Sequence, residues 1–402
     1  MRILYVTQGF PYPLTSGFLR HYHFIRELSA RHAVDLVSVV GADFQLEHAA
    51  TMASFTARVL TFQSADRSRA PWRKARSRAQ ALLLPQRGDT AVRALCAATE
   101  GLVRETRYDA AVLTGKRTFP VLEVLGRIPV VADLCDATSM RILGHLEHAG
   151  PWRRAALRLE LLEVRRVERW LMRRAAHLVF AAARDRDALL PATEQSRCSI
   201  IPNGVDVDYW RRTREQLGDR QIVFTGAMSY PPNEDAALLL AANILPQVRS
   251  AVPEAELWIV GRDPKPRLTA LGGQPGVHVT GFVDDVRPFL ERGAVFAAPL
   301  RFGAGIQNKV LEAMAMAVPV VASPLAADGL RAGDGAAPPV QTAGEPAAFA
   351  AVVVAQLAAA RRDPTPDHTA RQFVETHFRW ETNAAALEQV LHRVADDARR
   401  HR

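Results

Sequence analysis

Cysteine and long apolar segments are both scarce in this sequence, and each shortage excludes a class of protein. The three cysteines, Cys96, Cys135 and Cys198, are odd in number and far apart, so they imply no disulfide framework and fit a reducing compartment. No stretch reaches the roughly 18 uninterrupted apolar residues of a spanning helix. The apolar N-terminal stretch, which ends near Thr7, is too short for a signal peptide. We therefore expect a cytoplasmic protein.

What remains is the composition of a large globular protein. Hydrophobic residues make up 48% and charged residues 23% of the chain, which argues against wholesale disorder. The length of 402 residues predicts two or three domains. The net charge is +9, and arginine carries nearly all of the positive charge. A basic chain attracts phosphates, nucleic acids or anionic lipids, and an arginine excess also arises from a GC-rich genome. Charge alone does not choose among these explanations.

Alternating strand and helix patterns predict two α/β domains. Residues 2–7 and 34–40 have the pattern of buried strands with a helical pattern between them, which implies a parallel sheet with a crossover helix. The series continues to about residue 203, and a second series follows. We predict doubly wound domains over 1–203 and 204–379, with a C-terminal helix over about 380–402 packed back on the first. Ligands bind at the carboxyl ends of such strands, so we expect the site in a cleft between the domains.

The most informative segment is 299–316, where a strand gives way to a Gly-x-Gly turn and then to a helix. Free N–H groups at a helix start attract anions, and the helix dipole adds to this attraction. Gly305 allows a ligand to approach the backbone closely, while Arg301 and Lys309 supply positive charge nearby. This segment predicts a binding site for an anionic group.

Three polar side chains share one face of the helix that follows. At helical spacing Asn308, Lys309 and Glu312 lie within roughly 100° of one another, and the other helix positions are apolar. A carboxylate on such a helix needs a partner. A ligand diol such as a ribose is one candidate, and an ion pair with Lys309 one turn away is the other.

Other strand-end glycines fall on the same expected face. Gly226 and Gly261 end two strands of the second domain, and Arg262 beside them either pairs with a phosphate or is simply exposed. Gly17 begins the first crossover helix, next to Arg20, where a plain turn glycine is the alternative. No G-x-G-x-x-G sequence follows the first strand, so a nicotinamide-binding site has little support.

Two further groups of residues have open interpretations. Asp133 and Asp136 follow a strand of the first domain, where they either line an acceptor site or cap a helix. The neighbouring histidines lack the spacing of a tetrahedral metal site, so we expect no metal. Residues 67–87 hold six arginines and Trp72, and this segment either rests on an anionic membrane or forms a solvated basic face.

Several segments together resemble the GT-B glycosyltransferases, and more closely the retaining enzymes of glycosyltransferase family four. The resemblance extends over nearly the whole chain and is strongest at 201–206, 259–261, 279–286 and 311–322. Residues 224–233 and 305–312 further resemble sugar transferases that accompany bacterial exopolysaccharide and exosortase loci.

The resemblance implies a nucleotide-diphosphate sugar as co-substrate, held mainly by the second domain, with no cofactor. Glu312 corresponds to the glutamate that holds the ribose, Val283 to the residue whose backbone reads the base, and Gly17 to the glycine that faces the diphosphate. The backbone that meets the sugar and the diphosphate corresponds to Gly305, Ile306 and Gln307.

The sequence also departs from the family pattern. The first motif glutamate falls on Ala304, and the usual arginine and lysine after the first strand of the second domain are replaced near Ala227 and Asn233. Phosphate charge must then be neutralised by other cations. The candidates are Arg301, Lys309 and Arg262.

The expected activity is retaining transfer of a sugar from a nucleotide-diphosphate sugar to a hydroxyl, in bacterial cell-surface glycan or exopolysaccharide synthesis. The expected catalytic residues are Gly17, Lys309 and Arg301. The expected donor site comprises Gly226, Arg262, Val283, Gly305, Ile306, Gln307, Asn308 and Glu312, and the acceptor side Arg20, Asp133 and Asp136.

Other functions remain open at this stage. A natural-product glycosyltransferase and a nucleotide-sugar epimerase would use the same fold. The acceptor is a glycan, a lipid-linked molecule or a small molecule, and a lipid-linked acceptor would suit peripheral contact with the inner face of an anionic plasma membrane. No nucleic acid is expected as a partner, because no recognition module is present.

Overall fold

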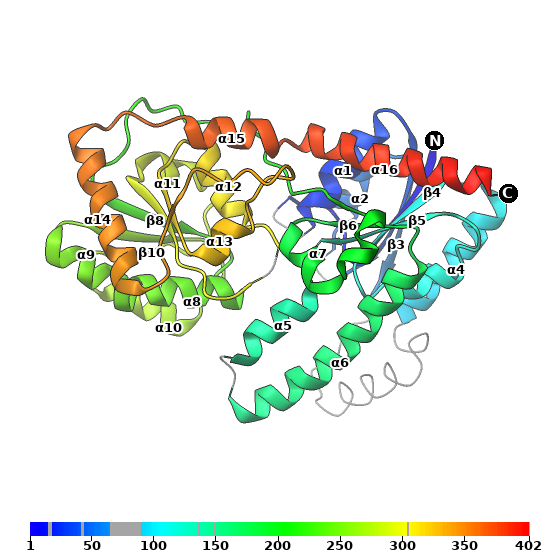
Figure 1. The fold of residues 1–402 in the computed structure, drawn as a ribbon, viewed down its shortest axis with the longest axis horizontal. Coiled ribbons are helices and arrows are strands. Elements are labelled where there is room, and N and C mark those ends of the chain that lie inside the picture. The colour runs from blue at the N-terminus through cyan, green and yellow to red at the C-terminus, as the bar shows by residue number, and fades with distance from the viewer. Residues whose placement is uncertain are drawn as a thin grey trace. The chain divides into compact units, whose positions relative to one another are not determined.

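The structure is a computed structural model that describes residues 1–14, 18–41, 44–64, 90–135, 137–147, 150–303 and 305–401. It divides into two compact units (Figure 1). The first comprises Met1–Ala181, Asp185–Ile201 and Trp380–Arg402, and the second comprises Ala182–Arg184 and Pro202–Arg379. Each unit is built on a parallel sheet with crossover helices, so the prediction of two Rossmann-like α/β domains is confirmed.

Unit 1 contains a seven-stranded sheet with the order β3-β2-β1-β4-β5-β6-β7. Its strands are β1 (Arg2–Thr7), β2 (Ala33–Val40), β3 (Arg58–Gln63), β4 (Ala110–Thr114), β5 (Val130–Cys135), β6 (His177–Phe180) and β7 (Cys198–Ile200). All of the pairs are parallel, and the central strands are buried on both faces, which explains their continuous apolar runs. The strand order reverses between β1 and β4, and this marks the switch point of the sheet.

Helices cover both faces of this sheet. They are α1 (Leu19–Ser29), α2 (Leu46–Ala53), α4 (Thr90–Glu105), η2 (Phe119–Glu123), α5 (Thr138–Glu147), α6 (Pro151–Arg174), η3 (Ala192–Arg197) and α16 (Trp380–Arg400), with α7 (Ala183–Leu189) beginning in unit 2. None of the helices that the structure describes is both long and apolar enough to cross a membrane.

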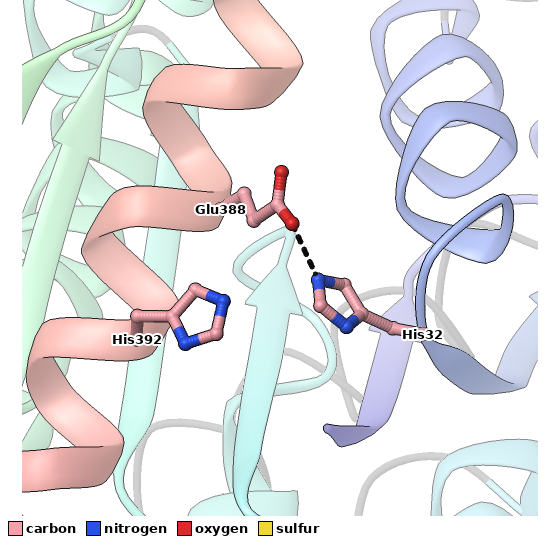
Figure 2. A group of neighbouring side chains, drawn as sticks. All are labelled: His32, Glu388 and His392. Carbon is pink, nitrogen blue, oxygen red and sulfur yellow. Dashed lines mark hydrogen bonds and ion pairs between the residues drawn. The ribbon is translucent and has the colours of Figure 1, made fainter.

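The C-terminal helix α16 packs beside α1 although nearly the whole chain separates them (Figure 1). The Trp380 ring stacks on His23 with centroids 4.4 Å apart, and Leu387 and Leu391 enter the same core as Phe24. Further along α16, a Glu388 carboxylate oxygen lies 2.7 Å from His32 Nε2, just after the end of α1 (Figure 2). Apolar burial and a polar contact therefore join α16 to unit 1.

Unit 2 contains a six-stranded sheet with the order β10-β9-β8-β11-β12-β13. Its strands are β8 (Gln221–Thr225), β9 (Glu256–Val260), β10 (Val277–Val279), β11 (Val295–Ala298), β12 (Val320–Ala322) and β13 (Gln341–Thr342). Its helices are α8 (Pro231–Leu239), η4 (Leu240–Ile244), α9 (Leu245–Ala251), α10 (Pro266–Thr269), η5 (Ala270–Gly273), α11 (Arg287–Arg292), α12 (Asn308–Ala315), α13 (Pro324–Asp328), α14 (Pro346–Arg362) and α15 (Thr369–His377).

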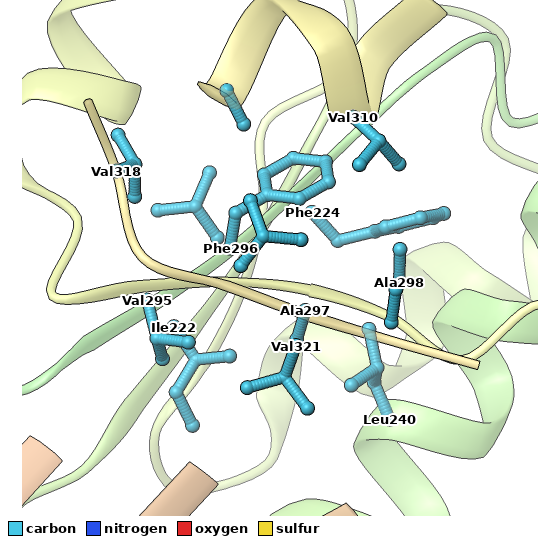
Figure 3. Close-up of a cluster of buried hydrophobic side chains, with 14 of the residues drawn as sticks. Ile222, Phe224, Leu240, Val295, Phe296, Ala297, Ala298, Val310, Val318 and Val321 are labelled. Atoms are coloured by element: carbon cyan, nitrogen blue, oxygen red, sulfur yellow. The ribbon is translucent and has the colours of Figure 1, made fainter. Parts of the chain in front are cut away.

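The core of unit 2 fixes the position of α12. Figure 3 shows side chains of the central strands packed with Val310 of α12 and Leu240 in one cluster. The rings of Phe224 and Phe296 lie 6.3 Å apart in this cluster, and both are fully buried. Because Val310 is also fully buried, the first turn of α12 is anchored to the strands beneath it.

Candidate functional site

Several predicted binding residues of unit 2 lie at the carboxyl edge of its sheet, at and beside the switch point. The strand order reverses between β8 and β11, which are neighbours in the sheet. Gly226 follows β8, Gly261 follows β9, and the turn before α12 follows β11. All three therefore lie at the carboxyl edge, where the loops of a doubly wound sheet bind ligands.

Gly226 and Gly261 are glycines because two backbones approach each other there. Both have positive φ, +153° and +144°, in a region that side chains rarely adopt. A Cβ on Gly261 would lie 1.9 Å from the backbone oxygen of Gly226. A Cβ on Gly226 would lie 2.6 Å from Asn233 Nδ2. Both positions therefore require glycine.

A glycine turn precedes α12. Gly303 and Gly305 have φ of +147° and +69°, so the turn extends to Gln307 and the helix begins at Asn308. The first intrahelical bond runs from Val310 N–H to the Gln307 carbonyl, at 2.9 Å. The N–H groups before it belong to the helix start, which is where an anion binds.

Lys309 is a half-buried cation in the first turn of α12. Its Nζ donates to Gln307 Oε1 at 3.0 Å and lies 5.7 Å from the centroid of the Phe224 ring. Burial lowers the pKa of Lys309 to about 8. An ammonium in so apolar a place gains from a strong anion, because the anion would offset the lost solvation.

Glu312 lies one turn further along the same face and is also half buried. Burial raises its pKa to about 7, and the nearby charge of Lys309 opposes this only in part. Among the described residues, no ion pair within 4.0 Å joins Lys309 to Glu312, so the helix does not form the i,i+3 pair that the sequence leaves open. The Lys309 ammonium bonds to Gln307 instead.

Two other predicted site residues, Asn308 from the donor site and Arg301 from the catalytic group, make contacts within unit 2. The Asn308 amide oxygen accepts a bond of 2.8 Å from Asn203 Nδ2. This bond joins the 201–206 segment to the start of α12. Arg301 donates through Nε to Asp235 at 2.9 Å, so the mobile cation expected there is already paired.

The remaining donor candidates range from exposed to half buried. The Arg262 side chain is 45% exposed, and its Nε lies 3.9 Å from Asp263. Ile306 and Val283 are half buried against the core of unit 2. Val283 follows Phe282, which is 66% exposed.

Sequence reasoning missed a polar group beside Gly226. Asn233 is only 5% exposed, and its Nδ2 donates to the Ala227 carbonyl at 3.0 Å. Its Oδ1 is buried and accepts no hydrogen bond from any residue that the structure describes. A Cβ on Gly226 would also lie 3.5 Å from Lys309 Cε, so the side chains of Asn233 and Lys309 both lie next to Gly226. The sequence offered one signal for this group, a polar residue soon after a glycine that ends a strand.

Glu234, the next residue, is a second missed feature. It is 1% exposed, and Lys265 and Arg267 both pair with its carboxylate. These pairs lower the pKa of Glu234. These ion pairs hold α10 against α8, and they leave Lys265 and Arg267 paired within the fold.

In unit 1, Arg20 and Asp133 are buried together. They are 4% and 1% exposed, and Arg20 Nε donates to Asp133 Oδ2 at 2.8 Å. Asp133 Oδ1 also accepts from the Cys135 N–H at 3.1 Å. Burial and hydrogen bonding of this kind are those of a structural ion pair. Gly17 and Asp136 lie outside the described residues, as does the basic segment 67–87.

The switch point of unit 1 brings together residues that the sequence did not single out. Gly115 follows β4 with φ +85°, and a Cβ there would lie 2.2 Å from the Gln8 side chain. Gln8 Oε1 accepts from the Arg117 N–H at 3.2 Å. Below them, His21 links Tyr5 and Thr114 through bonds of 3.0 and 2.7 Å. Burial lowers the pKa of His21 to about 4, so this histidine is neutral at pH 7.

One group among the described residues has the spacing of metal ligands: His32, Glu388 and His392, whose ligand atoms lie within 4.8 Å (Figure 2). Arg31 Nε is 3.1 Å from both Glu388 oxygens, and the N-terminal ammonium is 3.2 Å from His32 Nδ1. A divalent cation would have to compete with these two positive groups. The contacts that are present attach α16 to Arg31 and His32 of unit 1.

Comparison with known proteins identifies the sequence pattern and the fold. Residues 219–359 match the family model described as Glycosyl transferases group 1. A phosphatidyl-myo-inositol mannosyltransferase from Mycobacterium leprae is 30% identical over 205 residues, covering 48% of this chain and 53% of that protein. The chain thus spans about half the length of that curated relative.

Two solved structures match nearly the whole chain. HepE from Anabaena, solved with UDP and glucose, has a TM-score of 0.65 at 15% identity and covers 97% of this chain and 99% of its own. Sucrose-phosphate synthase from Thermosynechococcus elongatus has a TM-score of 0.69 at 13% identity, with 98% of each chain covered. Residues 219–359 therefore carry the sequence pattern of group 1 glycosyl transferases, and the chain has the Rossmann-like GT-B fold.

Proposed function

We propose that the protein transfers a sugar from a nucleotide-diphosphate sugar to a hydroxyl acceptor with retention of anomeric configuration. The observation that carries this proposal is the start of α12. There a glycine turn, a half-buried lysine of lowered pKa and a half-buried glutamate of raised pKa meet at the switch point of unit 2. The match of residues 219–359 covers this whole arrangement.

Each part of the arrangement has a role toward such a donor. The N–H groups at the start of α12 and the ammonium of Lys309 would bind the diphosphate. Glu312, once ionised, would accept hydrogen bonds from a vicinal diol such as that of the ribose. The buried Asn233 Oδ1 would accept from a sugar hydroxyl near Gly226. The sequence resemblance assigns the base to the backbone at Val283.

The chemical step asks little more of the protein. The bond from the sugar C1 to the diphosphate oxygen breaks, a bond from C1 to the acceptor oxygen forms on the same face, and the acceptor proton passes to the leaving diphosphate. Fixed N–H groups and Lys309 stabilise the charge that develops on that leaving group, with little reorganisation. No protein base is required for this route.

The biological setting is part of the proposal. The resemblance of 224–233 and 305–312 to transferases of exopolysaccharide loci supports a cell-surface glycan as product. The similarity to phosphatidyl-myo-inositol mannosyltransferases supports a lipid-borne acceptor. A natural-product acceptor and an epimerase activity are the competing functions.

Thermal denaturation with UDP-, GDP- and dTDP-sugars tests the donor assignment. One class should raise the melting temperature, because a ligand that binds only the folded state stabilises it. Lys309→Ala and Glu312→Ala should each lower turnover at least about tenfold. Lys265→Ala is the matched control, because that lysine pairs with Glu234 instead. No stabilisation by any activated sugar would refute the proposal, and donor turnover without an acceptor would identify an epimerase.

A further inference from the structure

The first half of α6 has two apolar faces, and only one of them is used by the fold. Leu157, Leu161 and Leu171 are buried and lie on one side of the helix. Trp152, at the helix start, is 90% exposed and lies on the opposite side. Leu159 and Leu162 share that opposite side with it and are 60% and 61% exposed, although leucine is commonly buried.

The exposed apolar residues form a stripe. At about 100° per residue, Trp152, Ala155, Leu159 and Leu162 fall within roughly 80° of one another, and the stripe lies about 180° from the buried leucines. Leu143 of α5, which packs against α6, is a further exposed leucine at 39%. Half of the eight large hydrophobic side chains that the structure describes as exposed thus lie within 143–162. This clustering separates them from scattered surface residues.

One border of the stripe is basic. Arg158, Arg165 and Arg169 are exposed and lie beside it, within roughly 40° of one another on the same helix. Among the eight arginines and three glutamates of α6, the one buried carboxylate, Glu168, pairs with Lys116 inside unit 1. An exposed tryptophan, leucines and flanking arginines are the composition of an interfacial helix.

We propose that this face of α6, formed by Trp152, Leu159 and Leu162 with Arg158 and Arg165, docks on an anionic lipid membrane. Two arguments favour a lipid surface over a second copy of the chain. Each copy carries a net charge of +9, so copies repel each other while anionic headgroups attract the chain. A stable protein interface also needs about 800 Å² from each partner, more than three side chains supply, whereas a few inserted side chains suffice at a bilayer.

This inference does not depend on the donor site, which lies in unit 2. It also differs from the membrane contact that the sequence leaves open for residues 67–87, and the two can be separated by mutation. If α6 docks, the basic border and the apolar stripe must each contribute to binding. If residues 67–87 bind alone, changes on α6 leave binding unaltered.

The test is flotation of the purified full chain with vesicles of phosphatidylcholine containing about one quarter phosphatidylglycerol. The wild type should float with these vesicles at low salt and less at high salt, and should not float with pure phosphatidylcholine. The double variant Leu159→Gln, Leu162→Gln should lower vesicle affinity at least about tenfold. Leu46→Gln, at an 82% exposed leucine of α2, is the matched control and should bind as wild type.

Charge and depth are tested separately. Arg158→Gln with Arg165→Gln should weaken binding and its salt dependence, while Arg93→Gln, at an exposed arginine of α4, should not. Lipids brominated in the acyl chain should quench tryptophan fluorescence in the wild type more than in Trp152→Phe. Failure of the wild type to float at low salt refutes the proposal, and so does unchanged binding of the Leu159/Leu162 variant. A concentration-dependent dimer that this variant abolishes would instead make the face a contact between copies.

Discussion

The two half-buried ionisable groups of α12 predict how donor affinity depends on pH. Burial lowers the pKa of Lys309 to about 8 and raises that of Glu312 to about 7 in the ligand-free protein. A bound diphosphate favours the ammonium, so it moves the pKa of Lys309 back up. A bound diol favours the carboxylate, so it moves the pKa of Glu312 back down. Donor binding therefore takes up a proton above about pH 8 and releases one below about pH 7.

The magnitudes follow from the sizes of these shifts. If binding returns Lys309 to its ordinary value of 10.5, affinity falls by about fifteenfold between roughly pH 8 and 9.5. If it returns Glu312 to 4.5, affinity falls by a similar factor, about fifteenfold, between roughly pH 7 and 5.5. The profile is a bell with its maximum between about 7 and 8. If donor binding shifts either pKa by less than this, affinity falls less steeply on that side of the pH profile.

Isothermal titration calorimetry with an intact nucleotide sugar measures this profile, because its diphosphate diester does not titrate in the range. Measurements in two buffers of different ionisation enthalpy give the protons exchanged. Lys309→Met should remove the alkaline fall and Glu312→Gln the acidic one, each at reduced affinity. A flat profile in the wild type, or a profile that both variants retain, would refute the assignment of these two side chains to the donor.

The remaining predictions concern stability and the separation of roles. Gly261→Ala should prevent unit 2 from folding normally, because its Cβ would meet a backbone oxygen at 1.9 Å, whereas Gly281→Ala, at φ +70° with open space around it, should cost only about 1–2 kcal/mol by chemical denaturation. Asp133→Ala should cost about 3–5 kcal/mol, since it leaves Arg20 charged and buried; a near-wild-type unfolding midpoint would contradict the structural ion pair. Arg301→Ala should lower turnover less than Lys309→Ala does, because Arg301 already pairs with Asp235, and an equal loss would return Arg301 to the diphosphate.

Removing the charge of Lys309 should affect the stability of the ligand-free protein in the opposite direction to donor affinity. A lysine whose pKa is lowered by folding destabilises the folded state below about pH 8, and the penalty fades as pH rises toward 10.5. At pH 7 Lys309→Met should therefore raise the free energy of unfolding of the ligand-free protein, by on the order of 1 to 3 kcal/mol once screening at a half-buried site is allowed for. A melting temperature that drops instead would show that the contacts of Lys309 with Gln307 and Phe224 outweigh the cost of its burial.

The candidate site was predictable where the residue type itself limits the conformation. Gly226, Gly261 and Gly305 stand out in the sequence because each follows a strand, and all three have positive φ. Lys309 and Glu312 stand out because they interrupt an apolar helix. The alternative, an ion pair between these two described residues, does not form because Lys309 turns back to Gln307, and one-turn spacing does not fix such a rotamer.

The partners of the predicted residues could not be predicted, because they come from distant segments. Asp235 reaches Arg301 from α8, and Asn203 reaches Asn308 from the start of unit 2. The burial of Asn233 depends on the close approach of the Gly226 backbone. Pairing of this kind is set by how helices pack on the sheet, and residue spacing along the chain carries no record of it.

The sequence by itself determined the two parallel α/β domains, because hydrophobic periodicity and strand-end glycines act locally. Tertiary structure alone decided which charges are neutralised and which stay available: Arg20 and Arg301 are paired, while Lys309 and Glu312 are left half buried with displaced pKa values. It also decided that α6 has a second, exposed apolar face, since only packing shows which side of a helix the core uses. The physical reason is that burial and electrostatic pairing are properties of the folded surroundings.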